Sequence, residues 1–157
     1  MKKVNFRNWE LIVDKDFTKL TYDKATMGSS DGCVCNECKN FANFRENTYP
    51  EEIKQLFNSL GIDYKKEFET CHYSRQKNGL HFYGSYFLFK GRFIGKDCKV
   101  PLDANEYTFD LTPITENFSI GFRKVNDFDL FEEKENIVQI EIETKIPWSI
   151  DKELECE

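Results

Sequence analysis

The sequence has no long apolar run, no excess of positive charge and only two histidines, and each of these absences narrows the range of functions. A membrane-spanning helix needs about 20 consecutive apolar residues, and no stretch of the 157 residues approaches that length. The first residues, from Met1 to Arg7, lack the continuous apolar core of a signal peptide. We therefore expect a soluble, cytoplasmic protein that has no membrane partner.

The balance of charge argues against a nucleic-acid partner. Lysine and arginine total 22, whereas aspartate and glutamate total 28, which gives a net charge of -6. A protein that binds the phosphate backbone needs a basic face that displaces counterions, and the pair Lys65-Lys66 is too short to supply one. The sequence also lacks a phosphate loop, a recognisable catalytic triad and a carboxylate pair with interpretable spacing.

Six cysteines are present, and three of them, Cys33, Cys35 and Cys38, fall within six positions. In a reducing cytoplasm such residues are thiols or metal ligands and not a disulfide framework. The spacing Cys-x-Cys-x2-Cys supplies three of the four ligands of a tetrahedral zinc site. Gly32 permits a tight turn before the first thiol, and Asn36 is predicted to be the N-cap of a helix whose first turn holds Cys38.

The candidates for the fourth ligand are Cys71, His72, His81 and Cys98. None of them stands in a second close pair of the kind that zinc ribbons and fingers contain. We predict a site formed by Cys33, Cys35, Cys38 and Cys71, with zinc as the cofactor. Two other interpretations of the cysteines remain open. They are buried reduced thiols that pack as small apolar side chains, or redox and nucleophilic thiols activated at a helix N-terminus.

The apolar pattern predicts a single α+β domain over residues 1–157, with a mainly antiparallel β-sheet and two helices near the N-terminal third packed on one face. The two helices are predicted at residues 36–47 and 50–60, and the second has Pro50 at its first position and Gly61 at its C-terminal end. A short strand is predicted at 17–22, and five or so strands follow residue 63.

Three of the later segments carry more specific predictions. Residues 80–94 have aromatic side chains on both faces, which is typical of a covered central strand or of one that lines a cavity, and Gly84 leaves a gap in it. The acidic stretch 125–135 is predicted to be a solvated loop. Residues 138–146 form a strand with one buried and one wet face, and Glu141 and Glu143 are predicted to be solvated on the wet face.

Several short motifs, taken together, resemble an uncharacterised family of small bacterial cytosolic proteins. The motifs are Cys33-Val34-Cys35-Asn36-Glu37-Cys38-Lys39-Asn40-Phe41, Tyr49-Pro50-Glu51-Glu52, Leu60-Gly61-Ile62-Asp63, Gly79-Leu80-His81-Phe82-Tyr83-Gly84-Ser85-Tyr86 and Ile146-Pro147-Trp148. This resemblance implies a shared fold and supplies no activity.

Two functions compete on these observations. The sequence favours a non-catalytic binding or interaction module, in which the cysteine cluster is structural and holds zinc, and whose partner is a protein or a small molecule. The alternative is a thiol- or metal-dependent enzyme that uses Cys35 or Cys38 with His72 or His81. A histidine on an aromatic strand is more often a hydrogen-bonded packing residue, which weighs against the enzyme.

Overall fold

One antiparallel sheet organises the protein, and its helices lie against one of the two faces. The computed structural model describes residues 1–125 and 136–156. The elements in chain order are β1 (Lys2–Phe6), β2 (Trp9–Val13), α1 (Lys15–Lys24), α2 (Ser29–Gly32), α3 (Asn36–Thr48), α4 (Glu51–Leu60), β3 (Glu69–Arg75), β4 (His81–Ile94), β5 (Lys99–Pro101), β6 (Tyr107–Phe109), β7 (Thr112–Thr115), β8 (Phe118–Val125), β9 (Ile137–Ile146) and a 3-10 turn at Lys152–Leu154.

The long strand β4 is the centre of the sheet. The strand order is β1-β2-β4-β9-β8-β7, and β3 also pairs with β4. One edge of β4 is shared, because β3 pairs with its first half and β2 with its last four residues. The other edge pairs with β9 from His81 to Lys90. Gly91 allows β2 to approach β4, since a Cβ there would lie 2.0 Å from the carbonyl oxygen of Ile12.

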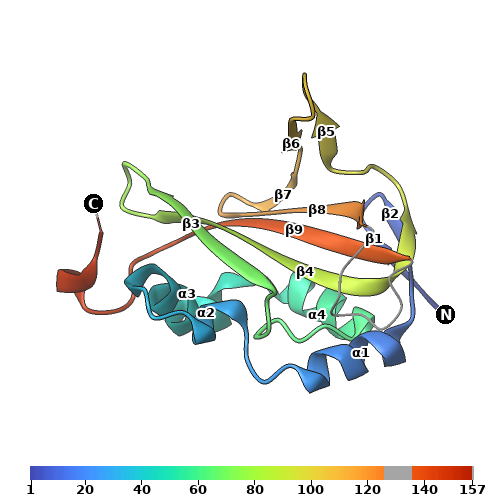
Figure 1. Ribbon diagram of the computed structural model, residues 1–157, viewed down its shortest axis with the longest axis horizontal. Helices are drawn as coiled ribbons and strands as arrows, with labels where there is room; N and C mark the ends of the chain where they lie inside the picture. Colours follow the sequence, from blue (N-terminus) through green and yellow to red (C-terminus); the bar gives the residue numbers. More distant parts are fainter. Residues whose placement is uncertain (126–135, 157) are drawn as a thin grey trace.

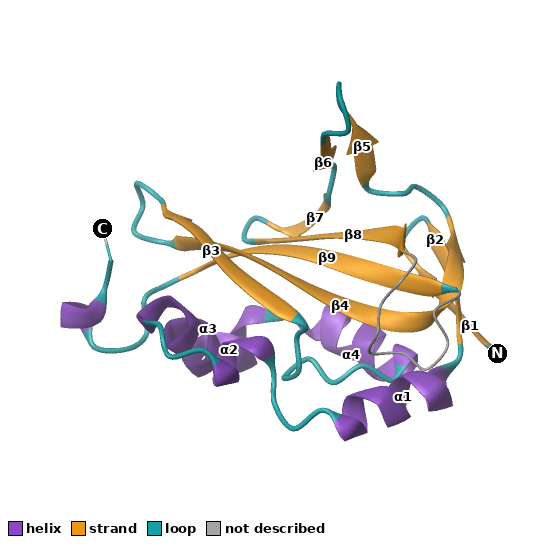
Figure 2. Cartoon of the chain, in the orientation of Figure 1, coloured by secondary structure: helices purple, strands orange, loops and turns teal. Residues whose placement is uncertain are grey.

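The main core fills the space between the sheet and the helices. Figure 1 shows α1, α3 and α4 beneath the sheet and the small β5–β6 ribbon above it, and Figure 2 shows that the helices α1 to α4 all lie on the same side of the sheet. Alternate residues of β4, β8 and β9 point toward the helices and are fully buried, among them Phe87, Phe122 and Ile140. The ring of Phe57 from α4 lies 4.7 Å from that of Phe87. The predicted α+β class and antiparallel sheet are confirmed.

The predicted second helix is confirmed in detail. Ile53, Leu56, Phe57 and Leu60 are all buried, as their helical spacing requires. Gly61 ends α4 in the left-handed conformation with φ of 83°, and the N–H of Ile62 donates to the carbonyl of Phe57 at 2.9 Å. This is the hydrogen bond of a Schellman motif. Pro50 is the N-cap of α4 and not its first helical residue.

The strand predicted at residues 17–22 is wrong, because these residues belong to helix α1. Asp14 caps that helix, since its side chain accepts a hydrogen bond from the N–H of Phe17. Thr18 and Tyr22, four residues apart, are the buried positions, and the Tyr22 hydroxyl donates to the carbonyl of Leu88 at 2.7 Å. The apolar alternation of this segment does not match its buried positions, because Leu20 is 60% exposed and Thr18 is fully buried.

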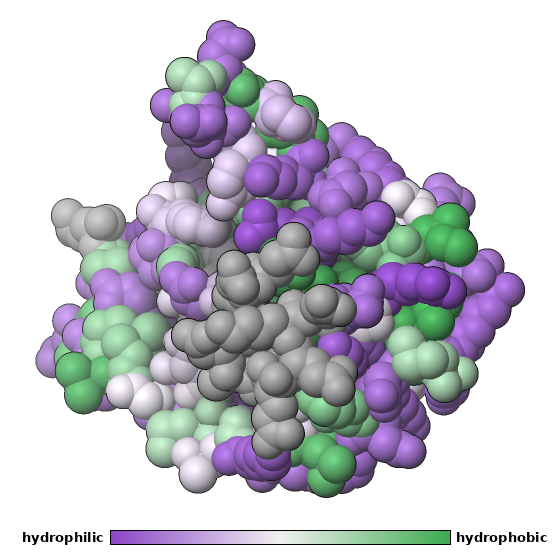
Figure 3. Space-filling model, turned by 45° about the vertical axis from the view of Figure 1, so that its right-hand side comes forward, coloured by the Kyte–Doolittle hydropathy of each residue, from purple (hydrophilic) through white to green (hydrophobic). Residues whose placement is uncertain are grey.

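The surface has the character that the composition predicts. In Figure 3 hydrophilic residues predominate on the visible face, with hydrophobic residues in small separate patches, and the β5–β6 hairpin projects from the body. Among the described residues no helix is long and apolar enough to span a membrane. The acidic loop predicted at 125–135 falls, except for Val125 in β8, outside the described residues.

The inward face of α4 generates a stability prediction. Leu60→Ala removes a fully buried side chain, and we expect a loss of about 2–5 kcal/mol in the free energy of unfolding. Leu20→Ala is the matched control, because Leu20 is a helical leucine that is 60% exposed. Urea unfolding followed by circular dichroism measures both values. Equal losses in the two variants would contradict the packing described here.

Candidate metal centre

Three thiols meet where α2 passes into α3. The Sγ atoms of Cys33, Cys35 and Cys38, hereafter the thiol cluster, all lie within 4.8 Å of one another. Those of Cys33 and Cys35 are 3.2 Å apart. Cys35 is the N-cap of α3, and its sulfur accepts a hydrogen bond from the N–H of Cys38. The predicted cap at Asn36 is therefore displaced by one residue, because a sulfur takes the role of the usual side-chain oxygen.

A buried ionic network fixes the segment that precedes the thiol cluster. The guanidinium of Arg45 in α3 lies 3.3 Å from Glu67 and 3.1 Å from Asp31. The Glu67 carboxylate is fully buried and also accepts from the N–H and hydroxyl of Ser30 in α2. Gly28 is required beside it, since a Cβ there would lie 2.5 Å from the carbonyl oxygen of Lys65. These contacts fasten α2 to α3 and thereby set the distance between Cys33 and Cys38.

The three thiols are electrostatically unequal. A hydrogen bond from the backbone N–H of Cys35, followed by hydrogen bonds with the thiols of Cys35 and Cys38, lowers the pKa of Cys33. Burial raises the pKa of Cys38 far above its ordinary value. Cys35 is exposed, whereas Cys38 is buried. The arrangement therefore has an open side at Cys35 and a side closed by α3.

The structure does not bring Cys71, the predicted fourth ligand, to the thiol cluster. In β3 successive side chains point to opposite faces of the sheet, so Cys71 faces away from the helices while its neighbour His72 faces toward them. Cys71 lines a cleft on the open face and contacts the carboxylate of Glu69 at 3.5 Å. Cys98, another candidate, is buried at the base of the β5–β6 hairpin, where its sulfur lies close to Gly121.

A second group of ligand atoms lies on the same side of the sheet as α3. His72 from β3, His81 from β4 and Cys156 from the C-terminal segment, hereafter the imidazole cluster, have ligand atoms within 4.8 Å of one another. His72 Nε2 and His81 Nδ1 are 2.9 Å apart. Burial, and then the neighbouring His81, lower the pKa of His72, which favours the neutral ring that binds metals.

Sequence reasoning named both histidines as single candidates and missed Cys156. This cysteine lies in a short charged segment that has no apolar periodicity to place it. The available signal was the aromatic Trp148 just after the last strand. Its ring lies 5.0 Å from that of His81 at an interplanar angle of 45°, so the chain turns back toward β4 here.

Glu37 is the second residue of α3. Hydrogen bonds, first from its own backbone N–H and then from the thiol of Cys156, lower the pKa of its carboxyl group. Its carboxylate belongs to neither of the two groups of ligand atoms that lie within 4.8 Å of one another.

The C-terminal segment is fastened by a buried amide. Asn40 in α3 is fully buried, and its Oδ1 accepts from the backbone N–H of Ser149 at 2.6 Å and from the Ser149 hydroxyl at 2.9 Å. Its Nδ2 donates to the carbonyl of Pro147 and to the hydroxyl of Tyr83, each at 3.2 Å. The segment that carries Cys156 is thus held against both α3 and β4.

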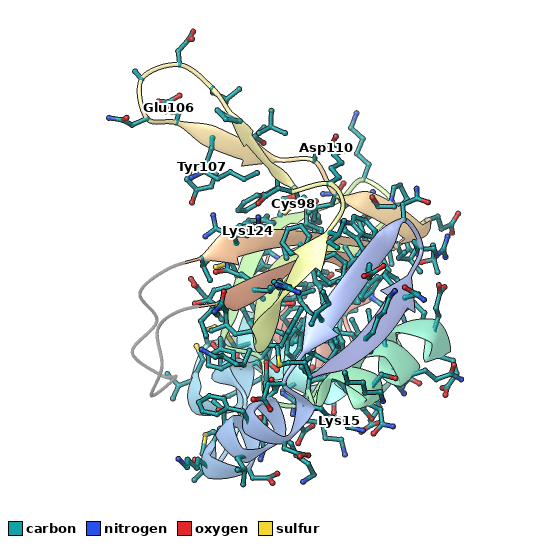
Figure 4. All side chains as sticks on the ribbon, turned by 90° about the vertical axis from the view of Figure 1, so that its right-hand side faces the viewer. Lys15, Cys98, Glu106, Tyr107, Asp110 and Lys124 are labelled. Carbon is teal, nitrogen blue, oxygen red and sulfur yellow. The ribbon has the colours of Figure 1, made fainter. Side chains whose placement is uncertain are left out.

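The open face of the sheet has a separate cleft of about 300 Å³. Figure 4 shows Tyr107 on the hairpin that overhangs this face, on the opposite side of the sheet from Lys15 in α1. The guanidinium of Arg123 lies 5.6 Å from the ring of Tyr107 and 5.3 Å from that of Phe109. Beneath them, burial raises the pKa of Glu141. The prediction that Glu141 is solvated is therefore wrong, because the hairpin covers that part of the wet face.

Comparisons with family models, with curated proteins and with solved structures gave no match. The resemblance to a bacterial family stays a prediction, and the geometry of the side chains carries the functional argument.

That geometry can be compared with the dimensions of a zinc site. With Zn–S bonds of about 2.3 Å, a tetrahedral ion holds its sulfur ligands about 3.8 Å apart. The thiols of Cys33 and Cys35 would separate by about half an ångström from their 3.2 Å spacing. Thiolates also suit zinc chemically, since they are the soft ligands that structural zinc sites use. The residues present therefore fit a zinc ion.

The ionic network beneath the thiol cluster generates the second prediction. Arg45→Met leaves the buried Glu67 carboxylate without its cationic partner, and we expect a loss of about 3–5 kcal/mol in the free energy of unfolding. The matched control, Arg7→Met, breaks the exposed pair between Arg7 and Glu52 and should leave the urea midpoint nearly unchanged. Equal midpoints for wild type and Arg45→Met would show that the network contributes nothing.

Proposed function

We propose that this chain is a non-catalytic binding module in which the thiol cluster holds a structural zinc ion. The observation that carries the proposal is the approach of three thiols within 4.8 Å of one another at the start of α3. Zinc sites of this kind need deprotonated ligands and contribute folding free energy directly. The ion would join the end of α2 to the first turn of α3.

The fourth position of a tetrahedral ion would be open here, because among the described residues no further His, Cys, Asp or Glu ligand atom lies within 4.8 Å of all three thiols. Cys71 cannot reach this position without reversing the face of β3 on which its side chain lies.

The alternative, a thiol enzyme that uses Cys35 or Cys38 with a histidine, receives less support from the electrostatics. A nucleophilic cysteine needs access and a lowered pKa, whereas Cys38 is buried and burial raises its pKa. Cys35 is exposed, but both histidines belong to a different group of ligand atoms from Cys35.

Metal content tests the zinc proposal. We expect protein purified without a histidine tag to contain at least one equivalent of zinc by elemental analysis. The double variant Cys33→Ser, Cys38→Ser should contain one equivalent of zinc less and have a lower thermal midpoint, because the site contributes to folding. Cys71→Ser is the matched control and should keep the full zinc content. Zinc-free wild-type protein whose thermal midpoint is unchanged by added zinc would overturn the proposal.

The cleft on the open face supports the binding role of the module and favours a small-molecule partner. The side chain of Gln139 is almost fully buried, and among the described residues its Oε1 has no hydrogen-bond partner. The Nε atom of Arg123 is also buried and has no hydrogen-bond partner among the described residues, although the Glu141 carboxylate lies 3.7 Å away. A buried acceptor and a buried donor without partners suit a ligand that carries an N–H beside a carbonyl, and Tyr107 and Phe109 suit a planar ring.

A panel of free nucleobases is the probe for this cleft, because they are planar rings with adjacent N–H and carbonyl groups. We expect at least one of them to shift the side-chain NMR signals of Gln139 and Arg123 in a saturable manner. Tyr107→Ala should weaken binding several-fold, and Tyr64→Ala, on the helical side, should not. No saturable shift with any base at millimolar concentration would contradict this ligand class.

A further inference from the structure

A hydrogen bond to a carboxylate fixes the orientation of the His81 ring in the imidazole cluster. His81 is fully buried, and its Nε2 lies 2.8 Å from Oε1 of Glu155. A carboxylate only accepts hydrogen bonds, so Nε2 carries the hydrogen and Nδ1 of the neutral ring keeps its lone pair. Arg75 lies 3.4 Å from the same Glu155 oxygen and holds the carboxylate in place. Such a carboxylate–imidazole pair is the usual support of a metal-binding histidine.

The hydrogen bond between the two rings marks the position of an ion. Because Nδ1 of His81 accepts, the hydrogen between the rings belongs to Nε2 of His72, 2.9 Å away. A cation at this point binds both nitrogens once the His72 hydrogen moves to its other ring nitrogen. In a tetrahedral zinc site the two nitrogens are about 3.3 Å apart, so the rings separate by less than half an ångström. Cys156, within 4.8 Å of both, supplies the third ligand and releases its thiol proton.

The charges of the two clusters complement each other. A divalent ion with three thiolates carries a net charge of about -1, whereas one with two neutral imidazoles and a single thiolate carries about +1. Opposite net charges attract, and they do so more strongly in a partly buried site than in water. Occupation of the thiol cluster should therefore favour occupation of the imidazole cluster.

We propose that His72, His81 and Cys156 form a second site for a zinc-class divalent cation. This site has its own ligands and its own test, separate from those of the thiol cluster. An ion there ties the C-terminal segment to β3 and β4.

Counting ions in site variants tests this proposal. The metal is removed from the full-length protein, which is then reloaded with Zn²⁺. Native mass spectrometry gives the number of bound ions, and competition with a chelator gives the Zn²⁺ affinities. We expect two ions in wild type and in the control Cys71→Ser, and one ion in His72→Ala with Cys156→Ser. Both altered residues are only half-buried, and circular dichroism confirms that each variant is folded.

The outcomes separate this inference from the proposed function. Suppose that wild type binds one ion, that the double variant His72→Ala, Cys156→Ser keeps it, and that the double variant Cys33→Ser, Cys38→Ser loses it. This result would leave the thiol site standing and overturn the second site. One ion that is kept by the second variant and lost by the first would overturn the thiol site and leave the second site standing. A second ion that binds only at millimolar Zn²⁺ would be adventitious and would also overturn the second site.

Discussion

The position of the centre depends on the buried amide of Asn40. Its two N–H groups donate to Tyr83 and Pro147, and its oxygen accepts twice from Ser149, so all its hydrogen-bonding capacity is used. These bonds join α3, β4 and the C-terminal segment, which are far apart in the sequence. An unpaired buried amide is costly, so the three segments are held in a single arrangement. That arrangement holds the segment that carries Cys156 against α3 and β4.

Strand β3 separates two chemical regions of the protein. Its alternate side chains supply Cys71 to the cleft on the open face and His72 to the imidazole cluster on the helical face. Gly84, the partner of Cys71 on β4, leaves space that the ring of Tyr73 fills, since a Cβ there would lie 2.2 Å from the tyrosine oxygen. The gap predicted from the sequence is therefore closed by a side chain of the neighbouring strand. The open face keeps the cleft beneath Tyr107 as its concave part.

The elements with strong periodicity could be predicted from the sequence, and the elements shaped by long-range contacts could not. Helix α4 and strand β9 follow single patterns, with Ile53 to Leu60 at helical spacing and Val138 to Ile146 in alternation. Helix α1 has only a short apolar stripe, and the bond between Tyr22 and Leu88, which anchors it, links residues 66 positions apart. The strand was predicted from the alternation of Phe17, Leu20 and Tyr22 with polar residues, and Leu20 of that alternation is exposed.

The candidate site also has a part that could be predicted from the sequence and a part that could not. The thiol cluster is local, because its members lie within six positions, and its convergence at a helix start was predicted. The position of Cys71, away from the thiol cluster, follows from the strand pattern, since Cys71 and His72 are adjacent in a strand and point to opposite faces. The position of Cys156 depends on how the C-terminal segment folds back, which no periodicity encodes.

X-ray absorption at the zinc edge tests most directly whether the fold gathers these ligands around metal. For the fully loaded protein the account predicts sulfur at about 2.3 Å as roughly half of the first shell, with nitrogen and oxygen at about 2.0–2.1 Å as the rest. A first shell of nitrogen and oxygen alone would contradict it, because the zinc would then lie away from the thiols that define the centre.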